Sequence, residues 1–125
     1  VLDKALHLLK QGREAMYKLI VFVPQSAKET LKSALFEAGA GGYGAYESCS
    51  WEVLGEGQFK PKNGANPYIG VLDTIGVVPE YRLEMLVDKS RWPAVQKVLY
   101  RIHPYEEPAF DLIEVVDIDP KTGVD

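Results

Sequence analysis

The sequence contains a single cysteine, Cys49, and two histidines in 125 residues. One cysteine cannot form a disulfide within the chain, and such scarcity is typical of a reducing compartment. We interpret Cys49 as a small, partly buried strand residue, with a soft ligand for Cu(I) as the alternative. The cysteine and histidine spacings of zinc sites are also missing, so we do not expect a structural zinc ion bound by one chain alone.

Long apolar runs and an export signal are missing as well. No stretch approaches the roughly 20 consecutive apolar residues that a membrane-spanning helix needs. The first residues do not show the charged, apolar and small-residue regions of a signal peptide. We therefore expect a cytoplasmic protein with no membrane partner.

Positive charge is in deficit, because 14 lysines and arginines face 18 aspartates and glutamates, for a net charge of −4. This balance argues against nucleic acid as a partner, since binding to its phosphates requires positive charge. Hydrophobic residues make up 46 % of the chain and charged residues 26 %, close to the averages of globular domains. A chain of this length has room for one core, and we predict a single domain.

The first residues differ in pattern from the rest. Residues 1–15 carry a short amphipathic stripe and precede Met16, where a strong strand pattern begins. We interpret them as an extension ahead of a natural start at Met16, residues 16–118 as the domain and residues 119–125 as a tail. His7 lies in the extension, so we expect it not to be a ligand.

A strand and a helix follow Met16. Residues 17–24 are rich in β-branched and aromatic residues, which predicts a buried strand. Ser26 and Glu29 have the spacing of a capping box at the start of a helix. The apolar residues beyond them recur at helical spacing as far as Gly39, which has the usual role of ending a helix.

The same layout returns in the second half of the chain. Residues 81–90 predict a strand, residues 91–102 a helix and residues 109–118 the last strand. The two halves align so that Tyr17 matches Tyr81. Two such halves predict an α+β, ferredoxin-like βαββαβ sandwich, in which two helices cover one face of an antiparallel sheet.

The region between the halves is longer than strand connections usually are. Two strand-like runs, 46–54 and 58–62, flank Gly55-Glu56-Gly57. We predict an extra β-hairpin between strands 2 and 3, with a turn or a bulge at these three residues. The stretch 63–70 follows and is dense in turn-forming residues. An exposed hairpin edge without a partner in the monomer favours a closed oligomer.

Residues 39–44 read GAGGYG and match the pattern G-x-G-x-x-G. A dinucleotide site needs a strand before this pattern and a helix after it. Here a helix precedes and a strand follows, so a phosphate would meet the wrong end of the helix dipole. We interpret the motif as a helix-to-strand loop with glycines in left-handed conformations.

The segment 103–108 reads HPYEEP and contains the strongest candidate site. Pro104 and Pro108 restrict the residues before them to extended conformations, so the segment is a rigid exit from the second helix. One imidazole and two carboxylates are too few to close a metal site within one chain, although neighbouring chains could complete it. The alternative is a structural turn in which His103 caps the helix.

Four motifs, at 18–24, 38–49, 55–70 and 103–108, closely resemble in this order the inserted domain of the Nif-three-like family. These are dinuclear-metal proteins also described as GTP-cyclohydrolase-type, and the resemblance covers about residues 16–118. The family's insert is similar in fold to the trimeric signal protein P-II and to CutA. The resemblance therefore implies a P-II/CutA-like fold and a homotrimer.

The resemblance also implies candidate ligand-binding residues, which are His103, Tyr105, Glu106, Glu107, Gly64 and Asn66. Of these, His103, Glu106 and Glu107 are the candidate ligands of a divalent metal ion. The family's dinuclear metal is held by histidines and acids outside the matching segment, so we do not carry over its hydrolase activity.

Three functions are compatible with these features. The first is a non-enzymatic binding or regulatory module that takes a divalent metal or a small anion in clefts between subunits. The second is an interaction module, such as a lid-like partner of a metal-dependent hydrolase, whose loops dock on protein. An enzyme with His103 as base and Glu106 as orienting group ranks last, because no nucleophile, cofactor motif or oxyanion donor is identifiable.

Overall fold

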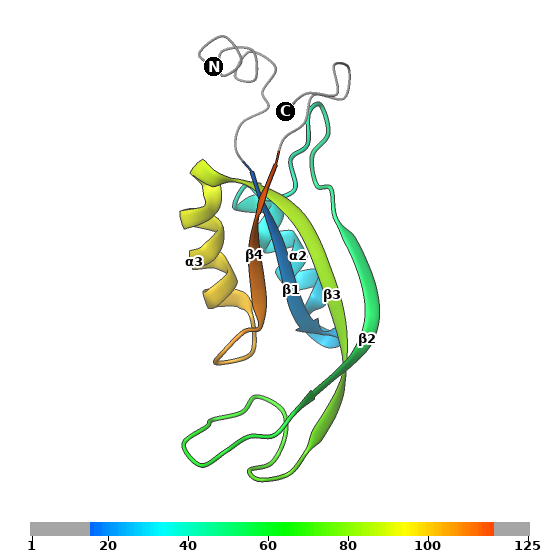
Figure 1. The fold of residues 1–125 in the computed structure, drawn as a ribbon, viewed down its shortest axis with the longest axis vertical. Coiled ribbons are helices and arrows are strands. Elements are labelled where there is room, and N and C mark those ends of the chain that lie inside the picture. The colour runs from blue at the N-terminus through cyan, green and yellow to red at the C-terminus, as the bar shows by residue number, and fades with distance from the viewer. Residues whose placement is uncertain (1–15, 117–125) are drawn as a thin grey trace.

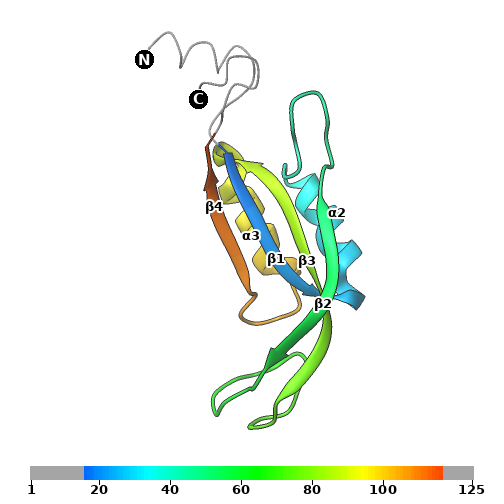
Figure 2. The same ribbon diagram turned by 45° about the vertical axis from the view of Figure 1, so that its right-hand side comes forward.

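The computed structural model describes residues 16–116. Within them the chain forms an antiparallel sheet in the order β2-β3-β1-β4. Figures 1 and 2 show both α-helices on one face of this sheet. The α+β, ferredoxin-like fold predicted from the sequence is confirmed. The elements in chain order are β1 (Met16–Pro24), η1 (Gln25–Ala27), α2 (Lys28–Glu37), β2 (Trp51–Phe59), β3 (Gly76–Asp88), η2 (Lys89–Arg91), α3 (Trp92–Ile102) and β4 (Phe110–Val115).

The core lies between the sheet and the two helices. Alternate residues of β1 face the helices, as the period of two in a strand requires. The helices contribute the apolar stripes expected from their sequence spacing. Nine side chains are fully buried in this core, and each contributes roughly 1.5–3 kcal/mol of hydrophobic stabilisation: Leu19, Val21, Val23, Leu31, Leu35, Leu83, Val87, Val95 and Leu99.

Helix α2 ends as predicted but begins differently. Gly39 adopts a φ of +113°, and the N–H groups of Gly39 and Ala40 reach the carbonyls of Phe36 and Leu35, both at 3.0 Å. This is the Schellman arrangement, in which glycine avoids the strain of a left-handed residue. The prediction of a capping box at Ser26 is wrong. The 3₁₀ turn η1 follows β1 directly, so the α-helix starts after it and the residue at the cap has no side-chain cap.

The turn predicted at Gly55-Glu56-Gly57 is also wrong. Strand β2 runs straight through these residues and pairs with β3 from Trp51 opposite Glu84 to Phe59 opposite Gly76. The chain reverses instead in the loop 60–75. Gly57 serves cross-strand packing and not a turn, because the side chain of Glu80 lies where a Cβ of residue 57 would be.

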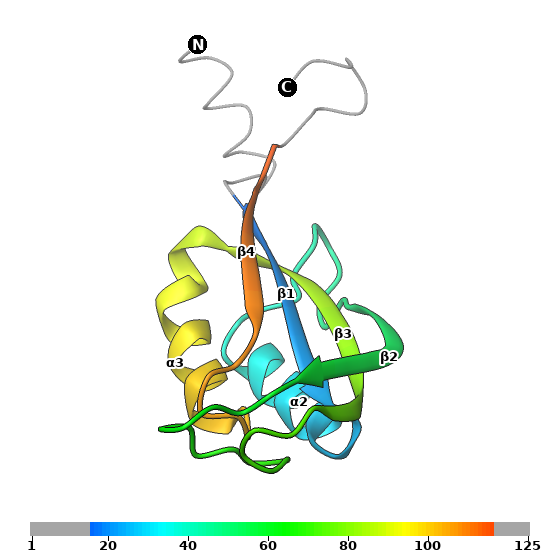
Figure 3. The ribbon, with the colours of Figure 1, turned by 60° about the horizontal axis from the view of Figure 1, so that its bottom comes forward.

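The far end of the β2–β3 hairpin projects beyond the rest of the sheet. Strand β1 pairs with β3 only from Glu80 to Asp88, so residues 56–79 extend past it. We call residues 56–79 the arm, and Figure 3 shows it folding across the end of the domain. The extra hairpin expected between strands 2 and 3 is therefore present as an extension of the main hairpin.

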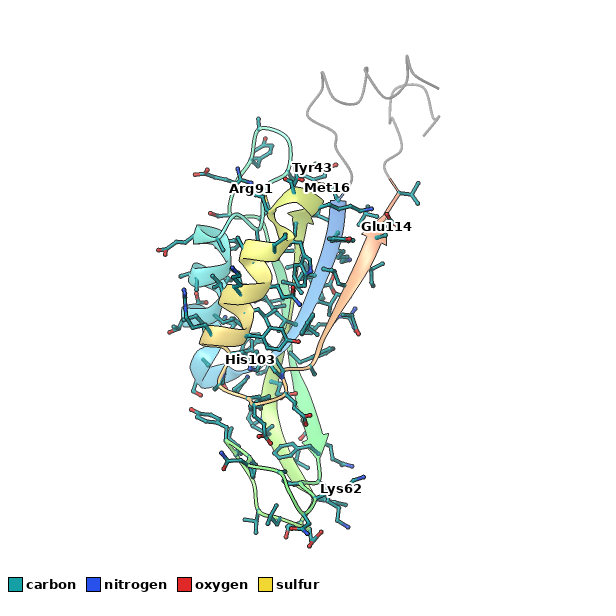
Figure 4. The ribbon with its side chains drawn as sticks, turned by 90° about the vertical axis from the view of Figure 1, so that its left-hand side faces the viewer. Met16, Tyr43, Lys62, Arg91, His103 and Glu114 are labelled. Carbon is teal, nitrogen blue, oxygen red and sulfur yellow. The ribbon has the colours of Figure 1, made fainter. Side chains whose placement is uncertain are left out.

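The two ends of the domain lie side by side, away from the arm. Met16, the first residue of β1, pairs with Val115, the last residue of β4, and Figure 4 shows Met16 close to Glu114 at the end opposite Lys62. The extension 1–15 with His7 and the predicted tail lie outside the described residues. None of the helices in 16–116 has the length and apolar character needed to cross a membrane.

Candidate functional site

The candidate site is a cleft where the arm meets the segment 103–108. Figure 4 shows His103 at the junction of arm and sheet, with Lys62 further out on the loop. The cleft has a volume of about 650 Å³ and lies between the loop 60–75 and the turn after α3, with Glu80 of β3 also in its wall. Sites for small molecules usually measure about 300–1,000 Å³, so a ligand of that size fits.

His103 lies beneath the cleft and is not among its lining residues. It is 5 % exposed, it follows the last turn of α3, and its N–H bonds to the carbonyl of Leu99 at 2.9 Å. The N–H of Tyr105 donates to Nδ1 at 3.1 Å, so Nε2 carries the proton and donates to the carbonyl of Phe22 at 2.8 Å. Both ring nitrogens have partners, and the neutral imidazole ties the exit of α3 to β1.

Burial also favours the neutral form of this histidine. The loss of solvent around the ring lowers the pKa of His103 below its usual 6.5, although the carbonyl of Phe22 and the charge of Glu80 oppose this effect. A metal could bind the ring only if one of its two hydrogen bonds were broken.

Tyr105 joins the turn to the base of the arm. Its hydroxyl donates a hydrogen bond to Oε2 of Glu80 at 2.8 Å. Its ring lies between those of His103 and Tyr68, at centroid distances of 5.0 Å and 6.3 Å. Burial, reinforced by the negative charge of Glu80, raises the pKa of Tyr105 above its usual value of 10.0. The hydroxyl therefore remains a donor at physiological pH.

Glu106 joins the same turn to the loop. Its Oε1 accepts a hydrogen bond from the backbone N–H of Asn66 at 2.8 Å. Nearby, Gly64 has a φ of +99° in a turn closed by the N–H of Ala65 and the carbonyl of Lys62. Asn66 therefore contributes its backbone, and Gly64 contributes a conformation that glycine adopts without strain.

The structure brings together most of the sequence-predicted residues, while His103 lies beneath the cleft. Tyr105, Glu106, Glu107 and Gly64 line the cleft, while Asn66 binds Glu106 at its edge. Cys49 takes no part in the cleft. Its predicted place on a strand is wrong, because β2 begins only at Trp51 and Cys49 lies in the loop before it, where its N–H bonds to the carbonyl of Gly41. That loop, 39–44, has left-handed glycines at three positions, as expected from its sequence.

Three charged residues of the cleft were missed in the sequence, namely Glu80, Lys60 and Lys62. Glu80 is fixed by a partner 25 residues away, and no local pattern indicates such a pairing. One signal could have pointed to it: glycine inside a strand often marks the close approach of another group. A Cβ on Gly57 would lie 1.9 Å from Oε1 of Glu80, so glycine leaves room for that carboxylate in its present position.

The charges around the cleft are mixed. Carboxylates of Glu80, Glu106 and Glu107 and ammonium groups of Lys60 and Lys62 all belong to its lining. Across residues 16–116 the two lysines enter no ion pair. In the same range, no three or more His, Cys, Asp or Glu side chains come together as a metal would require.

Comparison with known proteins gives the chain clear relatives. It is 41 % identical over 105 residues to the GTP cyclohydrolase 1 type 2 homolog of Mycobacterium leprae, covering 84 % of this chain and 27 % of the relative. It is 41 % identical over 111 residues to the homolog of the same name from Halalkalibacterium halodurans, and this match covers 89 % of this chain and 30 % of the relative. The chain thus spans less than a third of the length of these relatives. No protein-family model matches it.

Solved structures similar to this chain include a protein of the same kind as these relatives. A Bacillus cereus protein related to NIF3 superposes with a TM-score of 0.72 at 35 % identity, covering 83 % of this chain and 26 % of that one. The periplasmic divalent cation tolerance protein CutA from Archaeoglobus fulgidus gives a TM-score of 0.60 at 13 % identity and covers 86 % and 91 %. The Bacillus subtilis GlnK–ATP complex gives a TM-score of 0.55 at 18 % identity and covers 87 % of this chain and 92 % of that one. The last two share the fold.

Proposed function

Because the chain is a homologue of one segment of the Nif-three-like proteins, we propose that it is a binding or regulatory module whose cleft takes a small anion. The observation that carries this proposal is the placement of Lys60 and Lys62 on the wall of a cleft of about 650 Å³. The first two relatives are named for GTP, and GTP is an anion of a size that such a cleft accepts.

The two lysines supply positive charge that the cleft itself does not neutralise. Both side chains are exposed, and the described part of the chain offers neither an ion-pair partner. Lysine binds phosphate oxygens as a point charge with three donors. A phosphate or carboxylate group in the cleft would therefore satisfy both ammonium groups.

A divalent metal is the second candidate, favoured by the three carboxylates that line the cleft. Such a metal would neutralise acidic groups or polarise a bound anion. Within residues 16–116, however, no cluster of three potential ligands is present, and both nitrogens of His103 are hydrogen-bonded. Glu106 and Glu107 would bind a metal only if a neighbouring chain supplied further ligands.

A homo-oligomer, with a trimer preferred, belongs to the same proposal. Strand β2 is an edge of the described sheet, and it exposes three large apolar side chains, Trp51 at 58 %, Val53 at 45 % and Leu54 at 50 %. An apolar edge strand of this kind is usually covered by another chain or protected by charge.

The placement of the domain ends supports a role as one module of a longer architecture. Met16 and Val115 are partners in the sheet, so the chain enters and leaves the domain at adjacent points. Insertion of a domain into another protein is tolerated best when its ends are close together. We propose residues 16–118 as this module, with the arm directed away from the point of attachment.

The proposal is tested by thermal shift with three proteins: the natural chain, a Lys60→Gln/Lys62→Gln double variant, and Lys97→Gln as an exposed control on α3. The ligands are inorganic phosphate, pyrophosphate, GTP, ATP, Mg²⁺, Mn²⁺ and Zn²⁺. A ligand at about 100 times its dissociation constant stabilises the folded state by roughly 2.7 kcal/mol, which raises the melting temperature by several degrees.

We expect an anion to stabilise the natural chain and the Lys97 variant, and to lose most of its effect in the double variant. If only a metal stabilises the chain, and the Glu106→Gln/Glu107→Gln double variant loses this effect, then the ligand of the cleft is a divalent metal and not an anion. If no compound raises the melting temperature, the cleft is not a small-molecule site and the interaction module becomes the better explanation.

A further inference from the structure

Glu80 is the most constrained charged side chain of the cleft. Oε2 accepts the hydroxyl proton of Tyr105 at 2.8 Å. Oε1 occupies the space beside Gly57, 1.9 Å from the position that a Cβ would take there. The carboxylate is therefore held from both sides, by a phenol on the turn after α3 and by the bare backbone of β2.

A carboxylate held in this way is prepared to accept further hydrogen bonds. An ionised carboxylate has about four acceptor positions, and the Tyr105 hydroxyl takes one of them. Hydrogen bonds from N–H groups to a carboxylate are shorter and stronger than bonds between neutral groups. Because the side chain is already ordered, binding would cost little additional entropy.

Glu80 cannot serve the anionic part of a ligand, because like charges repel. The cleft also contains Lys60 and Lys62, which can. A ligand that satisfies both kinds of group is bipolar, with phosphate oxygens at one end and N–H donors at the other. Inorganic phosphate would leave Glu80 with Tyr105 as its one hydrogen-bond donor among the side chains described.

The apolar part of the lining indicates the shape of the donor end. Phe59, Pro61, Pro67 and Tyr68 line the cleft together with Glu80, and Tyr68 is 57 % exposed. Exposed aromatic faces and proline rings suit a flat ring, because stacking buries both of its faces. A heteroaromatic ring with N–H groups meets both requirements.

We propose that Glu80 is the specificity-determining residue of the cleft, and that the ligand is a phosphorylated heterocycle whose ring presents N–H donors to this carboxylate. This inference rests on the proposed function and names the class of anion. Tyr105 and Gly57 act as positioning residues, since they fix the carboxylate and leave room for it.

Two pairs of nucleotides that differ by one amino group test the inference. GMP carries the 2-amino group that IMP lacks, and AMP carries the 6-amino group that purine riboside 5′-monophosphate lacks. Dissociation constants are measured by calorimetry for the natural chain, Glu80→Gln, and Glu37→Gln as an exposed acidic control on α2. Circular dichroism verifies that each variant is folded.

In at least one pair, we expect the natural chain and the Glu37 variant to bind the donor-bearing nucleotide about tenfold more tightly, as one hydrogen bond to a charged group allows. In Glu80→Gln the ratio of the two dissociation constants should fall to about one. Equal binding within both pairs, or a preference that survives in Glu80→Gln, would overturn the inference while anion binding stands. If neither nucleotides nor pyrophosphate bind, the proposed function fails together with it.

Discussion

The hydroxyl of Tyr105 donates a hydrogen bond of 2.8 Å to the carboxylate of Glu80, and this contact joins two parts of the fold. Tyr105 belongs to the rigid turn after α3, while Glu80 stands on β3 where the arm leaves the sheet. A second contact, from the N–H of Asn66 to Glu106, joins the same turn to the loop of the arm at 2.8 Å. These two hydrogen bonds fix the two walls of the cleft relative to each other.

Replacement of Tyr105 by Phe should loosen the arm. The variant keeps the ring contacts with His103 and Tyr68 but leaves Oε2 of Glu80 without its donor. Because both side chains are partly exposed, we expect the free energy of unfolding to fall by only about 1 kcal/mol. Urea unfolding measures this change, and amide exchange should be faster in the arm than in the core.

Tyr43→Phe is the control for this prediction, because Tyr43 is 65 % exposed on the loop before β2. Its unfolding free energy and exchange rates should match those of the natural chain. Equal exchange in the arm of both variants would show that the Tyr105–Glu80 contact does not restrain it.

Replacement of Gly57 by Ala should displace the Glu80 carboxylate. The new methyl group would stand 1.9 Å from the present position of Oε1, so the side chain must turn away and exchange its contact with Tyr105 for solvent. We expect a loss of about 1 kcal/mol in stability, that of the broken Tyr105–Glu80 hydrogen bond, and a loss of any ligand preference due to Glu80.

Gly55→Ala is a matched control two residues earlier in the same strand. The nearest atom to its Cβ is the backbone oxygen of Glu80 at 4.0 Å, an ordinary contact. Alanine is favoured over glycine in a strand by roughly 0.5–1 kcal/mol, so this variant should be as stable as the natural chain or more stable. Equal destabilisation of both variants would refute the account of Gly57.

Stability should fall at mildly acidic pH because of His103. Its pKa is lowered in the folded protein by burial from the usual 6.5, so the unfolded chain binds the proton more readily. Folding therefore gains stability that is present above about pH 6.5 and is lost as the pH falls through the lowered folded pKa. Urea unfolding between pH 7.5 and pH 5 would measure this loss.

The His103→Gln variant should be less stable at neutral pH but should show a flatter profile across this range. His7→Gln replaces the other histidine of the chain and separates its contribution to the slope from that of His103. The acidic groups act in a separate window, since Lys28 and Lys18 lower the pKa values of Glu52 and Glu84 below the usual 4.5. A slope that persists in His103→Gln would assign the effect to other groups.

Replacement of Trp51 by Glu should weaken the proposed oligomer. Trp51 is 58 % exposed on the edge strand β2, and a charge in an apolar interface must lose its hydration on association. Light scattering should give about three times the monomer mass for the natural chain and a smaller mass for Trp51→Glu. Tyr46→Glu, on a residue 73 % exposed in the loop before β2, is the control and should not change the mass.

Much of this fold could be read from the sequence, because its elements depend on neighbouring residues. The spacing of Leu31 and Leu35 predicted the inner face of α2, and Gly39 predicted its end through a left-handed conformation. The prolines of 103–108 predicted a rigid turn. In each case the physical cause acts over at most a few residues, so a local pattern records it.

The glycines of β2 show where local pattern misleads. Gly55-Glu56-Gly57 resembles a turn in composition, yet the structure continues the strand through it. The reason lies on the opposite strand, where the side chain of Glu80 takes the space beside Gly57. The glycines permit both a turn and an extended strand at this point, and pairing with β3 selects the strand.

The sequence by itself determined the order of strands and helices, the buried stripes of both helices and the unusual chemistry of 103–108. Only the tertiary structure decided that Glu80, Lys60 and Lys62 belong to the same cleft. The hydrogen bonds that assemble it join residues 25 and 40 positions apart. Such contacts depend on strand register and on how the arm folds back, which are properties of the whole domain and not of any one segment.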